Sequence, residues 1–250
     1  MMEVKRNILD EKEVENMSLL ERIKELGDIH GIDFIGVAGI SQVENEIKAI
    51  GGELVSDFPR ALSIGIVLPN SIVNLLNDRD TYENVLQYKT HAYDVINNRL
   101  DNFASVVSSV IQRNGYKVMP LPTAERIDSN RVCASLSHKL TARLAGFGWI
   151  GKNCLLINPN YGPRIRWTSV LTDAPFEENK EILESKCGNC NRCAKICPAQ
   201  AILGRNYVEH EPRELRFDVK KCEEYFYKLK EECRLEICGM CLYVCPFGKK

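Results

Sequence analysis

The sequence predicts an α+β protein, with a mixed helix and strand domain over residues 17–176 and a small cysteine-rich domain over residues 177–250. Two observations predict this division. Apolar residues alternate between the spacing of helices and that of buried strands as far as Asp173–Ala174–Pro175. Nine of the eleven cysteines then follow, from Cys187 onward. Residues 1–16 are polar, and we expect them to form an N-terminal tail.

Helical spacing marks several segments of the larger domain. The first begins near Leu19 and is expected to end at Gly27 or Gly31. A long stretch of one or two helices follows at about 79–113, and Asn114–Gly115 terminates it. Two further helices are predicted at 42–48, on the surface, and at 134–145.

Short apolar runs predict buried strands. Their ranges are 34–38, 61–68, 116–121, 154–157 and 165–171. A glycine-rich loop is expected over Gly146–Lys152, between a helix and a strand. The charged stretch 177–186 is expected to link the two domains.

Composition narrows the class of protein. The 33 basic residues nearly balance the 34 acidic ones, which gives no general electrostatic reason for binding nucleic acid. No apolar run approaches the roughly 20 residues of a membrane span, and the charged N-terminus lacks the apolar segment of a signal peptide. We therefore expect a cytoplasmic protein without a membrane partner, in which the cysteines serve metal or redox chemistry.

The cysteine spacing predicts two 4Fe–4S clusters in a ferredoxin-like domain. A C-x2-C-x2-C-x3-C-P run begins at Cys187, and a second run ends at Cys245–Pro246. In this spacing three thiolates hold one cluster and the fourth crosses to the other. We assign cluster one to Cys187, Cys190, Cys193 and Cys245. We assign cluster two to Cys197, Cys222, Cys238 and Cys241.

Three alternatives to this assignment exist. Zinc ribbons also use C-x2-C pairs, although a zinc site does not need two C-x3-C-P endings. Disulfides would suit a secreted protein, which this sequence does not resemble. Cys233 could replace Cys222 as the upstream ligand of cluster two.

The glycine-rich loop contains a formal G-x-G-x-x-G at Gly146, Gly148 and Gly151. A dinucleotide site needs a strand before this motif and a helix after it, and here the order is reversed. We therefore reject a Rossmann site. Two interpretations stay open: the glycines let the chain approach a ligand, with Lys152 meeting a phosphate or carboxylate, or they form a helix cap and a tight turn.

The segment GWIGKN…LLI…YGPR…TDAP, followed by the two cysteine runs, resembles epoxyqueuosine reductase and, more distantly, the reductive dehalogenases. The resemblance extends over most of residues 17–248. It implies a nitroreductase-like α/β N-terminal domain, two 4Fe–4S clusters and a cobalamin near cluster one that reduces the substrate. It also implies cofactor contacts from a set of loop and helix residues: Lys139, Gly148, Trp149, Ile150, Gly151 and Lys152. The Lys221–Cys222 pair resembles the family's upstream cysteine.

The sequence differs from the family at the residue that serves as proton donor. The family's Asp-Ser pair aligns with Val132–Cys133 here, and an Asp128–Ser129 pair lies four residues earlier. The candidate catalytic residues are therefore Asp128 and His138, whose imidazole would titrate near ~6.5 if unperturbed. A surface or capping role for His138 is the alternative. Without a basic surface and without the family's helical-repeat tail, tRNA is a doubtful partner.

Arg164 and Arg166 alternate on a predicted strand and so face one side, where they could clamp an anionic part of a corrinoid or simply face solvent. FMN is an alternative to cobalamin, since nitroreductase-like domains often hold flavin. Two functions follow. One is an iron–sulfur reductase supplied by a low-potential donor such as ferredoxin or flavodoxin. The other is an electron-transfer protein or reductive activator of a corrinoid protein, without substrate chemistry of its own.

Overall fold

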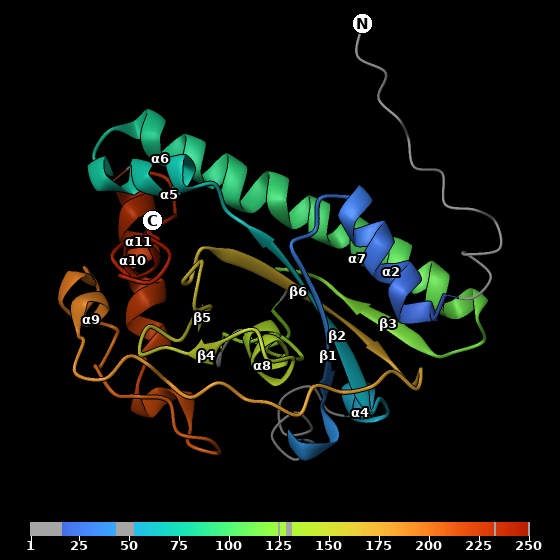
Figure 1. Cartoon of the computed structure of the whole chain (residues 1–250). Helices are drawn as coiled ribbons and strands as arrows, with labels where there is room; N and C mark the ends of the chain where they lie inside the picture. The colour runs from blue at the N-terminus through green and yellow to red at the C-terminus, as the bar shows by residue number, and fades with distance from the viewer. Residues whose placement is uncertain (1–16, 44–52, 125, 129–131, 233, 250) are drawn as a thin grey trace, which may run out of the picture.

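The computed structural model describes residues 17–43, 53–124, 126–128, 132–232 and 234–249 (Figure 1). Its centre is a four-stranded sheet of order β1-β2-β6-β3 in which all neighbouring strands are antiparallel. The strands are β1 (Phe34–Gly39), β2 (Arg60–Val67), β3 (Val118–Leu121) and β6 (Ile165–Thr172). The predicted mixture of helices and strands is confirmed, and each of these strands lies within two residues of its predicted range.

Helices α2 (Leu19–Ile29) and α7 (Ile96–Arg113) cover one face of this sheet (Figure 1). Ser18 begins α2 with a capping box, because its hydroxyl accepts from the Glu21 amide while the Glu21 carboxylate accepts from the Ser18 amide. The predicted 79–113 stretch is two α-helices, α6 (Tyr82–Lys89) and α7, joined by a π-helical segment at Thr90–Val95. A single apolar core joins α7 to β2 and β6.

Helix α8 (His138–Leu144) covers the opposite face. It is shorter than the predicted 134–145, because the preceding chain is held by a bridge between Asp128 and Cys133 and then bends. Leu144 on α8 and Leu136 before it pack with Ala61 and Leu171 of the sheet.

Several predicted ranges need correction. The glycine-rich loop contains a strand, β4 (Trp149–Ile150), which pairs with β5 (Leu156–Ile157). Short helices α4 (Glu53–Ser56) and α5 (Asn70–Asn74) were not predicted, nor were the 3-10 turns at Leu75–Asp78 and Arg213–Leu215. Of the predicted surface helix at 42–48, a 3-10 turn covers Ser41–Val43, and the rest lies outside the described residues.

The described residues of the cysteine-rich part form three α-helices, α9 (Arg192–Ile196), α10 (Val219–Glu231) and α11 (Met240–Tyr243). The chain that leads into it is extended and fastened to the sheet: the Asn179 amide donates to the Val37 carbonyl over 3.0 Å, and Glu178 pairs with Arg60 at 2.9 Å. In the described part of the chain, no helix has the length and apolar character to cross a membrane.

Candidate metal centre

The four cysteines predicted to hold cluster one line a single cavity: Cys187, Cys190, Cys193 and Cys245. A tight turn brings the first two together, since the Cys190 amide donates to the Cys187 carbonyl over 2.9 Å and Gly188 between them has a φ of 47°. Burial raises the pKa of the Cys193 thiol and raises that of Cys245 to about 11, and the neighbouring thiols of the set raise both further.

The four cysteines predicted to hold cluster two also lie together: Cys197, Cys222, Cys238 and Cys241. Burial raises the pKa of Cys222 to about 11 and that of Cys241 well above its usual value, and the other thiols of the set act in the same direction. Gathered thiolates repel one another, so iron that binds them replaces protons and relieves the repulsion.

The spacing of these side chains matters for the zinc alternative. In the parts of the chain that the structure describes, no three His, Cys, Asp or Glu side chains lie close enough to hold one metal ion. Zinc needs its ligands within about 2.3 Å of a single centre, whereas the irons of a cluster spread the ligands apart. Cys233, the alternative to Cys222, lies outside the described residues.

Among the described residues, two hydrogen bonds reach sulfur atoms of the cysteines predicted to hold cluster two. The Ala201 amide donates to Cys197 Sγ over 3.4 Å, and Arg79 Nη1 donates to Cys238 Sγ over 3.6 Å. Arg79 also donates to the Tyr225 hydroxyl at 2.9 Å. Such donors adjust the reduction potential of a cluster. No sequence pattern points to Arg79, which is 159 residues from Cys238.

The β4–β5 hairpin lines the cavity that contains the four cysteines predicted to hold cluster one. Trp149 is buried, and its ring meets that of Phe247 edge to face at 5.0 Å. Lys152 Nζ donates to Asn191 Oδ1 over 3.0 Å, and Asn153 Nδ2 donates to the Cys241 carbonyl over 3.0 Å. In the structure Lys152 therefore meets a neutral amide, and its contact with a phosphate or carboxylate of a ligand stays a prediction.

Glycines allow this close approach of the hairpin and the C-terminal segment. A Cβ on Gly148 would overlap the Ile157 carbonyl. Gly162 and Gly248 both have positive φ, and a Cβ on either would overlap the backbone of the other segment, at Phe247 and Tyr161. Cofactor contacts from Gly148, Ile150 and Gly151 stay a prediction.

Arg164 does not form the expected clamp. It is 1% exposed, and its Nη1 donates to Asn70 Oδ1 at 2.7 Å and to Asn74 Oδ1 at 3.1 Å. Arg166 donates to Asn97 Oδ1 from Nε and Nη2, at 3.0 and 2.9 Å. The Arg164 guanidinium therefore contacts α5, and the Arg166 guanidinium contacts α7.

The proposed acids differ in their surroundings. His138 Nε2 lies 3.0 Å from the Pro122 carbonyl and so carries a proton, and Nδ1 lies 2.9 Å from Ser169 Oγ. Burial lowers the pKa of His138 to about 4, which corrects the expectation of about 6.5 and leaves the imidazole neutral at pH 7. Asp128 is half-buried in the bridge with Cys133.

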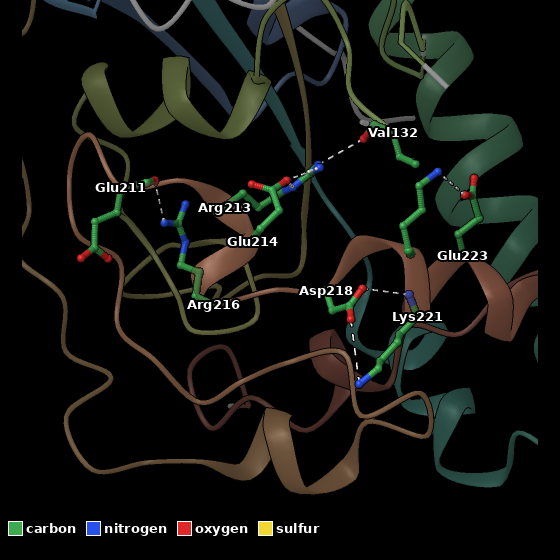
Figure 2. Close-up of polar contacts among 9 residues, drawn as sticks. Val132, Glu211, Arg213, Glu214, Arg216, Asp218, Lys221 and Glu223 are labelled. Carbon is green, nitrogen blue, oxygen red and sulfur yellow. Dashed lines mark hydrogen bonds and ion pairs between the residues drawn. The ribbon is translucent and has the colours of Figure 1, made fainter. Parts of the chain in front are cut away.

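Val132, which aligns with the family's aspartate, has a φ of 49°, and its carbonyl accepts from Arg213 Nη1 over 3.2 Å (Figure 2). A second link ties this loop to the cysteine-rich part: Arg126 pairs with Glu223 of α10 at 2.6 Å. Lys139 is half-buried, and loss of hydration lowers its pKa, with Arg213 and Arg216 contributing to the fall. Sequence reasoning missed both arginines, because they lie about 75 residues from Lys139 in a segment without a motif.

Comparison with known sequences agrees with this geometry. Residues 186–248 match the family described as the 4Fe-4S double cluster binding domain, which supports two 4Fe–4S clusters. The epoxyqueuosine reductase of Bacillus cereus is 33% identical over 144 residues, which are 54% of this chain and 35% of the relative. That of Cyclobacterium marinum is 25% identical over 93% of this chain and 81% of the relative. The alignment with the Bacillus relatives spans about a third of their length.

Solved structures share the fold. An epoxyqueuosine reductase aligns over 92% of this chain and 65% of its own, with a TM-score of 0.59 and 18% identity. The catabolic reductive dehalogenase NpRdhA aligns over 92% of this chain and 32% of its own, with a TM-score of 0.70 and 22% identity. The predicted resemblance of this chain to the epoxyqueuosine reductase-like family of double 4Fe–4S proteins is therefore confirmed.

Proposed function

We propose that the chain is a cytoplasmic iron–sulfur oxidoreductase that resembles epoxyqueuosine reductase and passes electrons through two 4Fe–4S clusters to a bound cobalamin. The observation that carries the proposal is the gathering of eight cysteines into two sets of four beside the β4–β5 hairpin. Cluster one would be held by Cys187, Cys190, Cys193 and Cys245. Cluster two would be held by Cys197, Cys222, Cys238 and Cys241.

The route of the electrons follows from the order of these parts. Electrons from a ferredoxin or flavodoxin would enter at cluster two and pass to cluster one, since each C-x3-C bridge ties the two sets together. Lys152 and Asn153, at the end of the hairpin, line the same cavity as the four cysteines that would hold cluster one. We assign residues 17–176 to a nitroreductase-like domain and residues 177–250 to the cluster domain. The antiparallel sheet with helices on both faces supports the first assignment.

Cobalamin would supply a low-valent cobalt that reduces the substrate. The residues near α8 fit such a group in one respect: buried polar atoms lack partners there. Trp149 Nε1 and Arg216 Nε are buried without a hydrogen-bond partner among the described residues. Lys139 and the Gly148–Lys152 hairpin would hold the cofactor, whereas Arg164 is excluded because its guanidinium faces α5. FMN is the alternative ligand, and neither the matched family nor the relatives named above point to it.

The proton would come from Asp128 and not from His138. At pH 7 His138 is neutral, and both ring nitrogens already lie at hydrogen-bonding distance from Pro122 and Ser169. Its role is then to fix β6 against α8. Replacing Asp128 with Asn should abolish turnover while leaving cobalamin binding unchanged, and full activity of this variant would exclude the role.

One solved relative is an epoxyqueuosine reductase with an epoxyqueuosine-modified tRNA stem loop. This chain has a formal net charge of −1, which gives no general attraction to RNA, so tRNA stays a doubtful partner that has to be tested.

A specific observation favours a second function, reductive activation of a separate corrinoid protein. At the position of the family's aspartate stands Val132, an apolar residue that cannot donate a proton. An activator would need only the two clusters and a docking surface.

Anaerobic reconstitution followed by iron counting and a cobalamin titration tests the proposal. About eight irons per chain and a saturable shift of the corrin absorption at micromolar cobalamin are expected. Eight irons without cobalamin binding would overturn the cobalamin assignment and favour the activator. An FMN titration would then be the next measurement.

A further inference from the structure

The 3-10 turn Leu75–Asp78 of the larger part contacts the loop that carries Cys238. The turn lies between α5 and α6, next to α11 (Figure 1). Gly239 follows the cysteine with a φ of 72°, and a Cβ there would lie 2.7 Å from a methyl carbon of Leu76 and 2.9 Å from the Tyr88 hydroxyl. Glycine therefore lets the loop come this close to the turn. The larger part thus fixes the backbone next to a cysteine that we assign to cluster two.

Arg79, directly after this turn, brings a positive charge to the sulfur of that cysteine. Its Nη1 donates to Cys238 Sγ over 3.6 Å, and its Nη2 donates to the Tyr225 hydroxyl over 2.9 Å. The guanidinium also lies 5.5 Å from the centre of the Tyr225 ring. From the other side, Arg234 Nη2 donates to the Arg79 carbonyl over 3.0 Å. Residues of the cysteine-rich part therefore hold both the side chain and the backbone of Arg79.

The acids beside Arg79 in the sequence have other partners. Asp78 accepts from the Thr81 hydroxyl over 2.6 Å, and Asp80 pairs at 3.0 Å with the arginine that holds the Arg79 carbonyl. Within the described residues, Arg79 forms no ion pair with a carboxylate, and it is half-buried. A guanidinium that is partly removed from water favours an anion at hydrogen-bonding distance. The cysteine sulfur, once it is a metal-bound thiolate, is such an anion.

We propose that Arg79 raises the reduction potential of cluster two. One electron from a ferredoxin or flavodoxin adds one negative charge to the irons and thiolates of this set, while Arg79 stays protonated and no proton moves. The attraction of the guanidinium is stronger for the more negative, reduced state. A higher potential makes cluster two easier to reduce, which suits the cluster at which electrons would enter. The inference rests on the proposed assignment of Cys238 to cluster two.

An EPR-monitored redox titration of the iron-loaded full chain tests this inference. Arg79→Gln should lower one of the two midpoint potentials by about 59 mV or more, which is a tenfold change in the equilibrium of a one-electron couple. The other midpoint potential should not change. Arg113→Gln is the matched control, because it removes the same charge from an exposed residue at the end of α7, and it should shift neither potential.

Three more variants identify the cluster and the contact. Cys193→Ser should remove cluster one, and Arg79→Gln in this background should still lower the midpoint potential that is left. Arg79→Lys keeps the charge but loses the planar fork that reaches both the sulfur and the Tyr225 hydroxyl, so it should give an intermediate potential. Tyr225→Phe removes the acceptor that orients the guanidinium and should lower the potential less than Arg79→Gln does.

Three results would overturn the inference while leaving both clusters assigned as proposed. Arg79→Gln could hold about eight irons with unchanged potentials, or it could shift both potentials equally, as a general charge effect would. Arg79→Gln and Arg79→Lys could each hold only about four irons, in which case the arginine serves the assembly of the cluster. Failure of the proposed function gives a different result, because Cys238→Ser would then keep the full iron content of the wild-type chain. That result would overturn the assignment and the inference together.

Discussion

The two parts of the chain bury apolar surface very differently. Helix α7 of the larger part has 18 residues and buries six of them against the sheet. Helix α10 of the cysteine-rich part has 13 residues and buries only Leu229, and α9 buries none. The buried residues of α11, Met240 and Leu242, pack into the core of the larger part. Among the described residues, the larger part thus has a core of its own, and the cysteine-rich part does not.

This difference indicates what holds each part together. Burial of apolar side chains stabilises the sheet and its helices. The cysteine-rich part depends on two other sources of stability, the metal bonds of its clusters and its contacts with the larger part. Those contacts include Asn153 with the Cys241 carbonyl and Arg79 with Cys238. Each experiment below tests one side of this contrast.

Removal of iron should have the largest effect. Without metal, we expect the backbone amides of α9, α10 and α11 to lose protection against hydrogen exchange, because no apolar core replaces the clusters. The amides of β2 and β6 should stay protected. Mass spectrometry of exchanged peptides measures both, and continued protection of α10 would break the contrast.

Substitution of a single cysteine should remove one cluster and leave the other in place. Cys193→Ser should reduce bound iron from about eight to about four atoms per chain, since each cluster takes four cysteines. Cys133→Ser changes a half-buried cysteine outside both sets and is the matched control, for which full iron content is expected.

A cavity in the core of the larger part should lower the free energy of unfolding. Phe103→Ala removes a buried ring from α7, and loss of about 3–5 kcal/mol in unfolding free energy is expected for such a change. Tyr227→Ala on α10 removes an aromatic ring that is 55% exposed and should cost less than about 0.5 kcal/mol. Urea unfolding of the iron-loaded proteins gives both values, and similar losses would contradict the contrast.

The sequence predicts some elements of the fold better than others. Strands β1, β2 and β6 were found in the sequence because their apolar runs are buried on both faces. Helix α8 was placed four residues too early, since the Asp128–Cys133 bridge is a tertiary contact without a local pattern. Strand β4 was missed because glycines surround its two residues.

Sequence spacing also grouped the cysteines, because a metal cluster imposes its own geometry on the ligands. It could not place Arg164, whose partners Asn70 and Asn74 lie about 90 residues away. Nor could it show that His138 is enclosed by Pro122 and Ser169, which lowers its pKa. Such properties depend on which distant side chains meet after folding.

His138 makes the stability of the larger part depend on pH. Its pKa falls from about 6.5 in the unfolded chain to about 4 in the fold, so its contribution is complete above pH 6.5 and is lost as the pH falls toward 4. When the pH is lowered from 7 to 5, this one group should decrease the free energy of unfolding by about 2 kcal/mol. His138→Gln should lack that part of the pH dependence, as urea titrations at both pH values would show. Equal pH dependence in both proteins would contradict the assignment.

The smallest effect is expected at a single contact between the two parts. Tyr243 on α11 donates to Asn77 Oδ1 over 2.7 Å, and its ring also lies 4.4 Å from Lys249 Nζ. Tyr243→Phe removes the hydrogen bond and keeps the ring, so about 0.5 kcal/mol should be lost at this exposed position. Because the contact joins the two parts, the loss should speed exchange of the α11 amides and leave those of β6 unchanged. Tyr227→Phe on α10 is the control. If β6 responds as strongly as α11, the two parts unfold as one unit and the contacts between them contribute more than the clusters do.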